Sequence, residues 1–220
     1  MADRAAGGQD VPAPRETGSD TLALWDWRRR IVDLYGAIRA SEPRAGREHW
    51  RATRDQLFRE HSQSPLSEPE RAAFAGLPVL PYDPALRFEV GTESIEGAPA
   101  IRVQLRDDGA LSFTAFARTL GLSAALGGEL TLYWIGGYGG GVFLPFRDAT
   151  SGRETYGGGR YLLDTIKGAD LGRTADGRVI LDFNFAYNPS CAYSDDWVCP
   201  LSPPENLLPV PIRAGELSPP

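Results

Sequence analysis

The chain has 220 residues, 42% of them hydrophobic, and a formal net charge of −6 at pH 7. This composition can build a core, which excludes a fully disordered chain, collagen and a long coiled coil, and no run approaches the roughly 18 apolar residues of a membrane span. An acidic protein repels phosphate backbones, so we expect no nucleic-acid partner and no membrane partner, and the oligomeric state stays open.

Gly and Pro together make up about 20% of the chain, which predicts many turns and short strands. Residues 1–19 hold no apolar segment like that of a secretory signal, and we expect them to form a disordered arm of a cytoplasmic protein. Residues 20–217 are expected to form a single domain. It comprises a helical part at 20–77, a β-rich part at 78–199 and a Pro-rich surface wrap at 200–217.

Two amphipathic helices are predicted at the start of the domain, the first capped by Ser19 or Asp20 and the second opened by Pro43. Their apolar faces follow the 3.6-residue helical period. These faces comprise Leu24, Trp27, Ile31, Leu34, Tyr35 and Ile38 in the first helix and Trp50, Leu57 and Phe58 in the second. The run Arg28-Arg29-Arg30 cannot form one stripe, because successive helical residues point about 100° apart. We interpret it as solvated helix surface rather than a nucleic-acid contact.

From residue 78 onward, apolar residues alternate as in β-strands. Asp108-Gly109 and Asp176-Gly177 are tight-turn dipeptides between such strands. The segment at 130–135 is apolar on both faces, so we expect a strand buried on both sides. No strand–helix alternation follows. The predicted fold is therefore α+β, with N-terminal helices packed on a predominantly antiparallel β-sandwich or barrel.

Two glycine clusters interrupt the strands. Residues 136–141 open no helix that could cradle a phosphate, so we predict a flexible hairpin loop. Residues 155–161 contain three glycines followed by Arg160, whose planar guanidinium suits a carboxylate or phosphate. The alternative for Arg160 is a structural ion pair with Asp148 or Asp182.

Asp182 and Asn184 would point to the same face of a strand, because side chains alternate along it. If that face lines the mouth of a barrel, a carboxylate and an amide meet where a ligand could bind. We therefore predict a pocket for a small anionic molecule, with catalysis as an open question and no cofactor expected. The predicted lining residues are Arg160, Tyr156, Asp182, Asn184, Asn188, Tyr193, Glu205 and Asn206.

Seven residues separate Cys191 from Cys199, more than in a zinc knuckle, and His49 and His61 are distant in sequence, so no metal site is predicted. Both thiols are expected to be reduced in the cytoplasm. A third hypothesis is a thiol enzyme in which His61 serves as base for Cys191, and the candidate catalytic residues are Cys191, His61 and Asp182. The alternatives are a helix-terminal cap for His61 and an inert buried thiol for Cys191.

A different class of function is a structural or protein-interaction module. In this hypothesis the paired helices and the Pro-rich tail bind a partner or a second copy of the chain, and the exposed half of residues 25–35 carries the contact. The oligomeric state distinguishes it from the pocket.

A series of short motifs runs along the chain from Trp50 onward. They lie at residues 61–66, 74–77, 144–148, 150–152, 155–161, 182–184, 187–189, 191–193, 199–201, 203–206 and 214–216. Together they resemble a bacterial family known as domain of unknown function 1684, over roughly residues 45–217. The resemblance implies one full-length domain and no particular chemistry.

Overall fold

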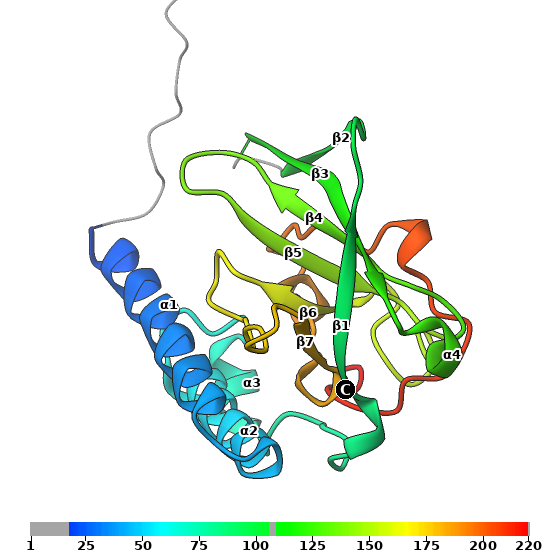
Figure 1. Ribbon diagram of the computed structural model, residues 1–220. Helices are drawn as coiled ribbons and strands as arrows, with labels where there is room; N and C mark the ends of the chain where they lie inside the picture. Colours follow the sequence, from blue (N-terminus) through cyan, green and yellow to red (C-terminus); the bar gives the residue numbers. More distant parts are fainter. Residues whose placement is uncertain (1–17, 106–108, 220) are drawn as a thin grey trace, which may run out of the picture.

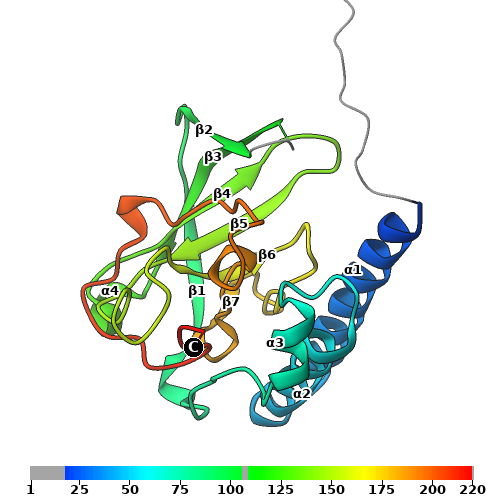
Figure 2. The ribbon, with the colours of Figure 1, turned by 180° about the vertical axis from the view of Figure 1, so that it is seen from behind.

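The computed structural model describes residues 18–105 and 109–219, and its first three helices form one layer (Figures 1 and 2). Helices α1 (Gly18–Arg39) and α2 (Pro43–Glu60) lie side by side, and the short α3 (Glu68–Ala73) follows. Pro43 stands at the start of α2, as predicted. Of the arm predicted at residues 1–19, residues 1–17 lie outside the described residues, and residues 18 and 19 already belong to α1.

The predicted apolar faces of α1 and α2 pack into the protein. Ile31, Leu34 and Tyr35 of α1 are buried, and Trp50 of α2 is fully buried. The Trp50 indole N–H donates a hydrogen bond to the Tyr35 hydroxyl at 3.2 Å, which joins the two helices inside the core. Within the described residues, no helix combines the length and the apolar character that a membrane span requires.

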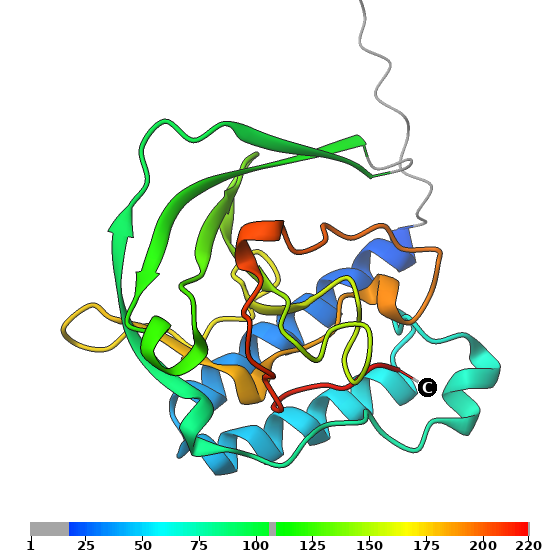
Figure 3. The same cartoon turned by 90° about the vertical axis from the view of Figure 1, so that its right-hand side faces the viewer.

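Seven antiparallel strands in the described residues form one sheet. They are β1 (Arg87–Ser94), β2 (Ala100–Leu105), β3 (Gly109–Leu120), β4 (Thr131–Ile135), β5 (Gly141–Phe146), β6 (Arg160–Asp164) and β7 (Val179–Asp182). Their hydrogen-bonded order is β6-β5-β4-β3-β1-β7, with β2 attached to β3. The sheet curls until it is nearly closed into a barrel (Figure 3). This confirms the predicted α+β fold, with helices packed on an antiparallel sandwich or barrel.

The predicted hairpins are present. Strands β2 and β3 form an antiparallel pair in which Leu105 lies opposite Gly109. Asp108 of the predicted turn lies outside the described residues. The glycine cluster at 136–141 joins β4 to β5 in a hairpin, as predicted, and Gly140 there has a φ of 45°, a left-handed conformation that glycine adopts readily.

Both faces of the sheet are covered. One face packs against α1 and α2 through aromatic side chains that include Phe113, Tyr133, Phe143 and Tyr161. The opposite face forms a second apolar cluster. That cluster includes Leu132, Leu144, Phe146, Leu163, Leu181 and Phe183. Strand β4 is therefore buried on both sides, as predicted, except at Trp134, which is 45% exposed.

The Pro-rich tail is extended, as expected, but it lies deeper than a surface wrap. Leu208, Ile212, Ala214 and Glu216 are buried, and Glu216 forms an isolated bridge with Val79. The tail thus completes the core next to the helices. Local composition does not reveal this, because the partners of the tail are remote in sequence.

Glu129 holds the turn that follows β3. Its carboxylate accepts hydrogen bonds from the backbone N–H groups of Gly121, Leu122 and Ser123 and from the hydroxyls of Thr119 and Ser123. Partial burial alone would raise the pKa of Glu129, but these hydrogen bonds outweigh it and lower the pKa to about 2.

We expect this turn to be sensitive to acid. The folded-state pKa of Glu129 lies below its usual value of 4.5, so the contribution of the carboxylate is complete above pH 4.5 and is lost as the pH falls toward 2. Glu129→Gln is expected to lower the free energy of unfolding at pH 7 by on the order of 1 kcal/mol and to flatten its decline between pH 4.5 and 2. Urea denaturation at several pH values measures both effects. The exposed Glu93→Gln is the control, and an unchanged slope in Glu129→Gln would contradict the assignment.

Candidate functional site

A cleft of about 470 Å³ opens between α1, the helix-facing side of the sheet and the segment that precedes the Pro-rich tail. Its size falls within the roughly 300–1,000 Å³ of small-molecule sites. It is lined by Leu24, Trp27, Arg28, Gln63, Leu111, Ile135, Phe143, Tyr161, Asp164, Ile166, Lys167, Ser190, Trp197, Val198, Cys199 and Pro200. Most of these side chains are apolar, and several are aromatic.

A smaller recess of about 70 Å³ adjoins the cleft on the side of the core. Trp27, Tyr161, Lys167 and Ser190 line both spaces. The remaining lining residues of the recess include the buried polar side chains of Arg54 and Asn188. The two spaces together offer an apolar chamber with a polar inner end.

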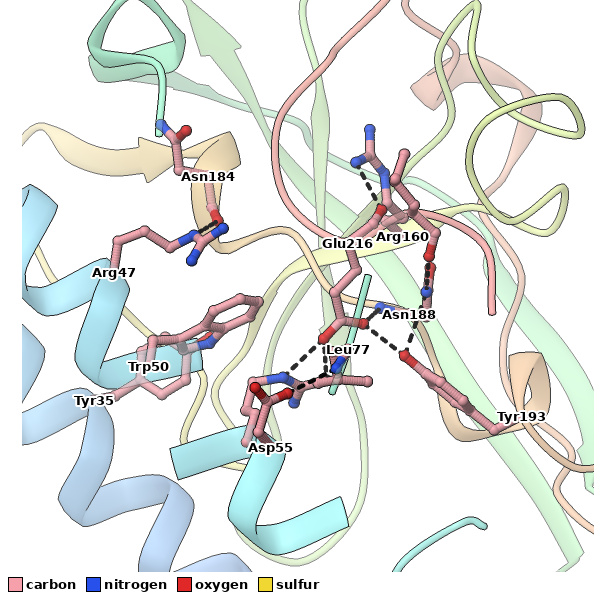
Figure 4. A network of polar contacts seen from close by, with 12 residues as sticks. Tyr35, Arg47, Trp50, Asp55, Leu77, Arg160, Asn184, Asn188, Tyr193 and Glu216 are labelled. Carbon is pink, nitrogen blue, oxygen red and sulfur yellow. Dashed lines mark hydrogen bonds and ion pairs between the residues drawn. The ribbon is translucent and has the colours of Figure 1, made fainter. Parts of the chain in front are cut away.

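Glu216 organises the polar groups around the recess (Figure 4). One of its carboxylate oxygens accepts hydrogen bonds from Nε and Nη2 of Arg54, at 2.8 and 2.5 Å. The other oxygen accepts from the backbone N–H of Asn188 at 2.8 Å and from the Tyr193 hydroxyl at 2.9 Å. The carbon at the centre of the Arg54 guanidinium also lies 5.1 Å from the ring centroid of Trp50 and 5.1 Å from that of Tyr187. Tyr187, like Arg54, lines the recess. The tail, α2 and the segment after β7 are thus fixed to one another at this point.

The side-chain oxygen of Asn188 is buried and has no hydrogen-bond partner among the described residues. Its side-chain nitrogen donates to the carbonyl oxygen of Leu217 at 2.7 Å and to the Tyr193 hydroxyl at 3.4 Å, which fixes the orientation of the amide. A buried acceptor without a partner costs about 1–3 kcal/mol. The amide oxygen of this recess-lining residue is therefore an acceptor that the described protein groups leave unused.

Positive charge predominates on the cleft wall. Lys167, the single lysine of the chain, places Nζ 3.6 Å from the Asp164 carboxylate, and Arg28 contributes a second cation. Arg29 and Arg30 instead pair with carboxylates on α1 itself, as expected for solvated helix surface. Two cations and one carboxylate leave the wall with a net positive charge, which favours an anionic group.

The two cysteines lie at one edge of the cleft, where Cys199 and Ser190, the residue directly before Cys191, both line it. Cys199 lines the cleft, and the Sγ atom of Cys191 lies 3.6 Å from the Tyr156 hydroxyl. A hydrogen bond from the Cys191 thiol is the largest cause that lowers the pKa of Cys199 to about 6, against the effect of burial. The backbone N–H groups of Cys191 and Ser190 and the charge of Lys167 act in the same direction. The contact between the thiols, followed by burial, raises the pKa of Cys191.

Arg160, predicted as an anion-binding group, is enclosed by protein groups. Its side chain is 1% exposed, and Nη2 donates to the Asp148 carboxylate at 2.9 Å. The guanidinium also donates to the backbone carbonyls of Ile212, Ala214 and Glu216. The alternative predicted for Arg160, a structural ion pair with Asp148, is thus confirmed, and Arg160 has no place in the lining of the cleft.

Asp182 and Asn184 do meet, but not on one face of a strand as predicted. Strand β7 ends at Asp182, and Phe183–Phe185 form a 3₁₀ turn in which the backbone N–H of Asn184 donates to the Asp182 side chain at 3.0 Å. The Asn184 side chain donates to the same oxygen at 2.7 Å. Both residues are buried, and burial raises the pKa of Asp182. Neither residue lines the cleft, and neither is among the hydrogen-bond partners of Arg160. The pair stabilises a chain reversal, which is a frequent use of Asp and Asn in turns.

The other predicted lining residues separate into two groups. Asn188 and Tyr193 belong to the network around the recess, and Tyr156 contacts a thiol. Glu205 and Asn206 lie elsewhere, against the sheet, and do not line the cleft. Glu205 accepts from the Tyr133 hydroxyl, while Asn206 bonds the backbone of Thr131 and Pro145. These last two side chains hold the tail against β4 and β5.

The predicted pairing of His61 with Cys191 is not formed. Nδ1 of His61 accepts the backbone N–H of Gln63 at 3.0 Å, and Nε2 lies 3.4 Å from the Asp26 carboxylate. The alternative is confirmed, because His61 is the C-cap residue of α2. Cys191 has its contacts with Tyr156 and Cys199 instead. Among the described residues, no group of three or more His, Cys, Asp and Glu side chains could hold a metal ion.

The sequence prediction missed most of the cleft. Trp27 belongs to the predicted apolar face of the first helix and Tyr161 to a predicted strand after the three glycines, and neither was among the predicted lining residues. Each is mostly buried, yet each also borders the cleft and the recess. No local signal in the sequence marks these residues as the lining of a cleft.

The sheet, the helical layer and the side cleft define an α+β protein with a nearly closed barrel and a cleft of ligand size beside α1. The chain belongs to the family described as "Protein of unknown function (DUF1684)", which matches residues 72–217. A solution NMR structure of an uncharacterized protein from Haloarcula marismortui is similar, with 34% sequence identity and a TM-score of 0.53. The similarity covers 76% of this chain and 89% of that protein. No curated protein matches the chain significantly.

The family match begins after α2 and therefore includes only part of the cleft. Leu111, Phe143, Tyr161, Lys167 and residues 197–200 lie inside the matched segment. The wall contributed by α1 lies outside it.

Proposed function

We propose that the protein binds a small, largely apolar organic molecule with an acidic group, in the cleft beside α1. The observation that carries the proposal is the cleft itself, about 470 Å³ in volume and lined mainly by apolar and aromatic side chains. Sites for small molecules share this character, with a few polar groups that orient the ligand. The proposal keeps the anionic ligand that the sequence suggested and assigns it to other residues.

The walls suggest how such a molecule would lie. The indole rings of Trp27 and Trp197, which are partly exposed, provide flat apolar surfaces for a ring or a short chain. Lys167 and Arg28 supply positive charge for the acidic group. A hydrogen-bond donor on the ligand could reach the free side-chain oxygen of Asn188 in the recess.

The proposal predicts that filling the cleft abolishes binding. The probe is 8-anilinonaphthalene-1-sulfonate, an aromatic sulfonate whose fluorescence rises in apolar sites. Leu24→Trp enlarges a side chain on the cleft wall and is expected to weaken binding of the probe at least tenfold, or about 1.4 kcal/mol. Leu22→Trp makes the same change on α1 at a side chain that is 62% exposed and outside the cleft, and should leave binding unchanged.

A second comparison tests the charge of the wall. Lys167→Gln is expected to weaken binding of the anionic probe by up to about fivefold, because partly exposed ion pairs contribute about 0.2–1 kcal/mol. Binding of the neutral dye Nile red should not change. The exposed Arg153→Gln removes a cation that does not line the cleft and is the control. If wild type and Leu24→Trp bind the sulfonate equally well, the cleft is not the binding site. If Lys167→Gln weakens the binding of both dyes equally, the ligand needs no acidic group.

The alternative, an interaction module, has one supporting observation. Leu22 and Trp25 on α1 are 62% and 65% exposed, which is high for large apolar side chains. If two copies of the chain bury this surface, gel filtration will give a dimer that Trp25→Glu converts to a monomer. A monomer at all concentrations would leave binding in the cleft as the supported function.

A further inference from the structure

The thiols belong to two segments that the fold brings together at the cleft. Cys191 lies in a 3₁₀ turn (Ser190–Ala192), and Cys199 lies just before the Pro-rich tail. Both are free and half-buried. Of the residues between them, Asp195, Asp196 and Trp197 are exposed and lie outside helices and strands, so few packing contacts oppose a small movement of this loop.

The surroundings of Cys199 favour its thiolate. The backbone N–H groups at the start of the 3₁₀ turn, from Ser190 and Cys191, act on its sulfur, as do the Cys191 thiol and the positive charge of Lys167. Because Cys199 lines a cleft of about 470 Å³, a small reagent can reach this sulfur. An accessible thiolate beside a second thiol is the arrangement found in cysteines that respond to oxidants.

We propose that Cys199 and Cys191 form a peroxide-reactive pair that closes to an intramolecular disulfide at the edge of the cleft. This inference goes beyond the proposed ligand binding and does not depend on it. The cytoplasmic location expected from the sequence would keep both thiols reduced until an oxidant arrives.

The reaction has two steps. The Cys199 thiolate attacks one oxygen of a hydroperoxide, the O–O bond breaks, and the other oxygen leaves as an alcohol or as water after taking a proton. The Cys199 sulfur is thereby oxidised to a sulfenic acid, and the peroxide is reduced. The Cys191 sulfur then attacks the Cys199 sulfur, the S–S bond forms, and the hydroxyl leaves as water with the proton of the Cys191 thiol. In sum, two thiols and one hydroperoxide give one disulfide, one alcohol or water, and one further water.

The lining of the cleft assigns the order of reaction. Cys199 borders the cleft and Cys191 does not, so a reagent in the cleft meets the Cys199 sulfur first. The neighbouring Cys199 sulfur raises the pKa of the Cys191 thiol. Oxidation of Cys199 removes the negative charge from that sulfur, so the Cys191 proton becomes easier to lose at the moment when its sulfur must attack. Tyr156, whose hydroxyl lies 3.6 Å from the Cys191 sulfur, can stabilise the resulting negative charge.

The test treats the full-length, reduced protein with a slight excess of hydrogen peroxide. Wild type is expected to lose two titratable thiols and 2 Da, without a change in oligomeric state. Cys191→Ser should stop at the sulfenic acid, which dimedone traps. Cys199→Ser should react at least about tenfold more slowly, since a thiolate reacts far faster than a thiol. Circular dichroism checks that both variants fold.

Alkylation by iodoacetamide provides a second measurement of the order. Each of the variants Cys191→Ser and Cys199→Ser keeps one thiol, whose rate of alkylation is measured by itself. At pH 7, Cys199 in Cys191→Ser should react faster than Cys191 in Cys199→Ser. Its pH profile reflects the charged and titratable groups around it, namely Cys191, Tyr156, Tyr161, Lys167, Asp164, Asp195 and Arg28.

Three results would overturn the inference: disulfide-linked dimers in place of the 2 Da loss, a dimedone adduct that persists in wild type, or peroxide reactivity that survives Cys199→Ser. Binding of the aromatic sulfonate by reduced wild type and by both variants is measured in parallel. If the thiols do not react as described but the protein still binds the sulfonate, this inference alone is rejected. If the thiols react but the protein does not bind the sulfonate, the proposed ligand is rejected.

Discussion

Replacing Glu216 by alanine is expected to lower the free energy of unfolding by about 3–5 kcal/mol, the usual cost of leaving one buried charge without its partner. The carboxylate is fully buried and accepts four hydrogen bonds, two of them from the Arg54 guanidinium. Without it, the Arg54 charge, the Asn188 backbone N–H and the Tyr193 hydroxyl all lose their acceptor inside the protein. Urea denaturation followed by circular dichroism measures the change.

The chain contains a matched control on its surface. Glu154 and Arg213 form an Arg–Glu pair with an N···O distance of 2.9 Å, but their side chains are 40% and 61% exposed. Glu154→Ala is expected to cost less than about 1 kcal/mol. Equal effects of Glu154→Ala and Glu216→Ala would show that burial of the Glu216 network contributes nothing.

A double variant separates the charge from the volume. Arg54→Met combined with Glu216→Leu removes both charges and keeps apolar bulk, so it should recover part of the stability lost in Glu216→Ala. It would still lack the acceptor for the backbone N–H of Asn188, so the recovery should be incomplete.

The sequence was sufficient for those elements whose signal is local. The helical period around Ile31 and Trp50 reports which face is buried, and a helix needs no partner in sequence to show that face. Proline at the start of α2 and the glycines between β4 and β5 act through backbone geometry alone. The α+β class, the hairpins and the doubly buried β4 follow from such signals.

The candidate site could not be predicted in this way, because its residues are set by contacts between distant segments. Arg160 follows three glycines and resembles a ligand-binding group, yet the three backbone carbonyls that it binds lie more than fifty positions later, in the tail. Asp182 and Asn184 satisfy the alternation of a strand, but a short-range hydrogen bond ends the strand between them. The cleft arises where α1, β6 and the segment at 197–200 approach one another, and no single stretch of sequence encodes that approach.

The two cysteines illustrate the limit most clearly. Sequence reasoning assigned the base to His61, which was the available histidine near a helix end. In the folded chain, backbone N–H groups, a second thiol and a lysine provide the stabilisation instead. These contributions come from the backbone and from tertiary proximity, and neither is visible in the spacing of residue types. The thiol that we propose to react first is consequently Cys199 rather than Cys191.

The second large effect is expected at Arg160. Arg160→Ala should lower the free energy of unfolding by at least about 3 kcal/mol, because it leaves the buried Asp148 carboxylate unpaired and three tail carbonyls without their donor. Arg160→Lys should recover little, since an ammonium cannot reproduce the planar fork that reaches the carboxylate and the carbonyls together. Urea denaturation measures both variants, and the exposed Arg153→Ala is the control, with an expected change below about 0.5 kcal/mol.

A readout on the tail distinguishes a structural Arg160 from a ligand-binding one. The guanidinium holds the backbone at residues 212, 214 and 216, so in Arg160→Ala limited proteolysis should cut the tail near these positions before the sheet is attacked. The surrounding core side chain Phe146, whose ring centroid lies 5.1 Å from the guanidinium carbon, should become more accessible at the same time. If Arg160→Ala instead kept wild-type stability and an intact tail but bound anions less tightly, the guanidinium would be a ligand group after all. The Asp148 pair would then be secondary.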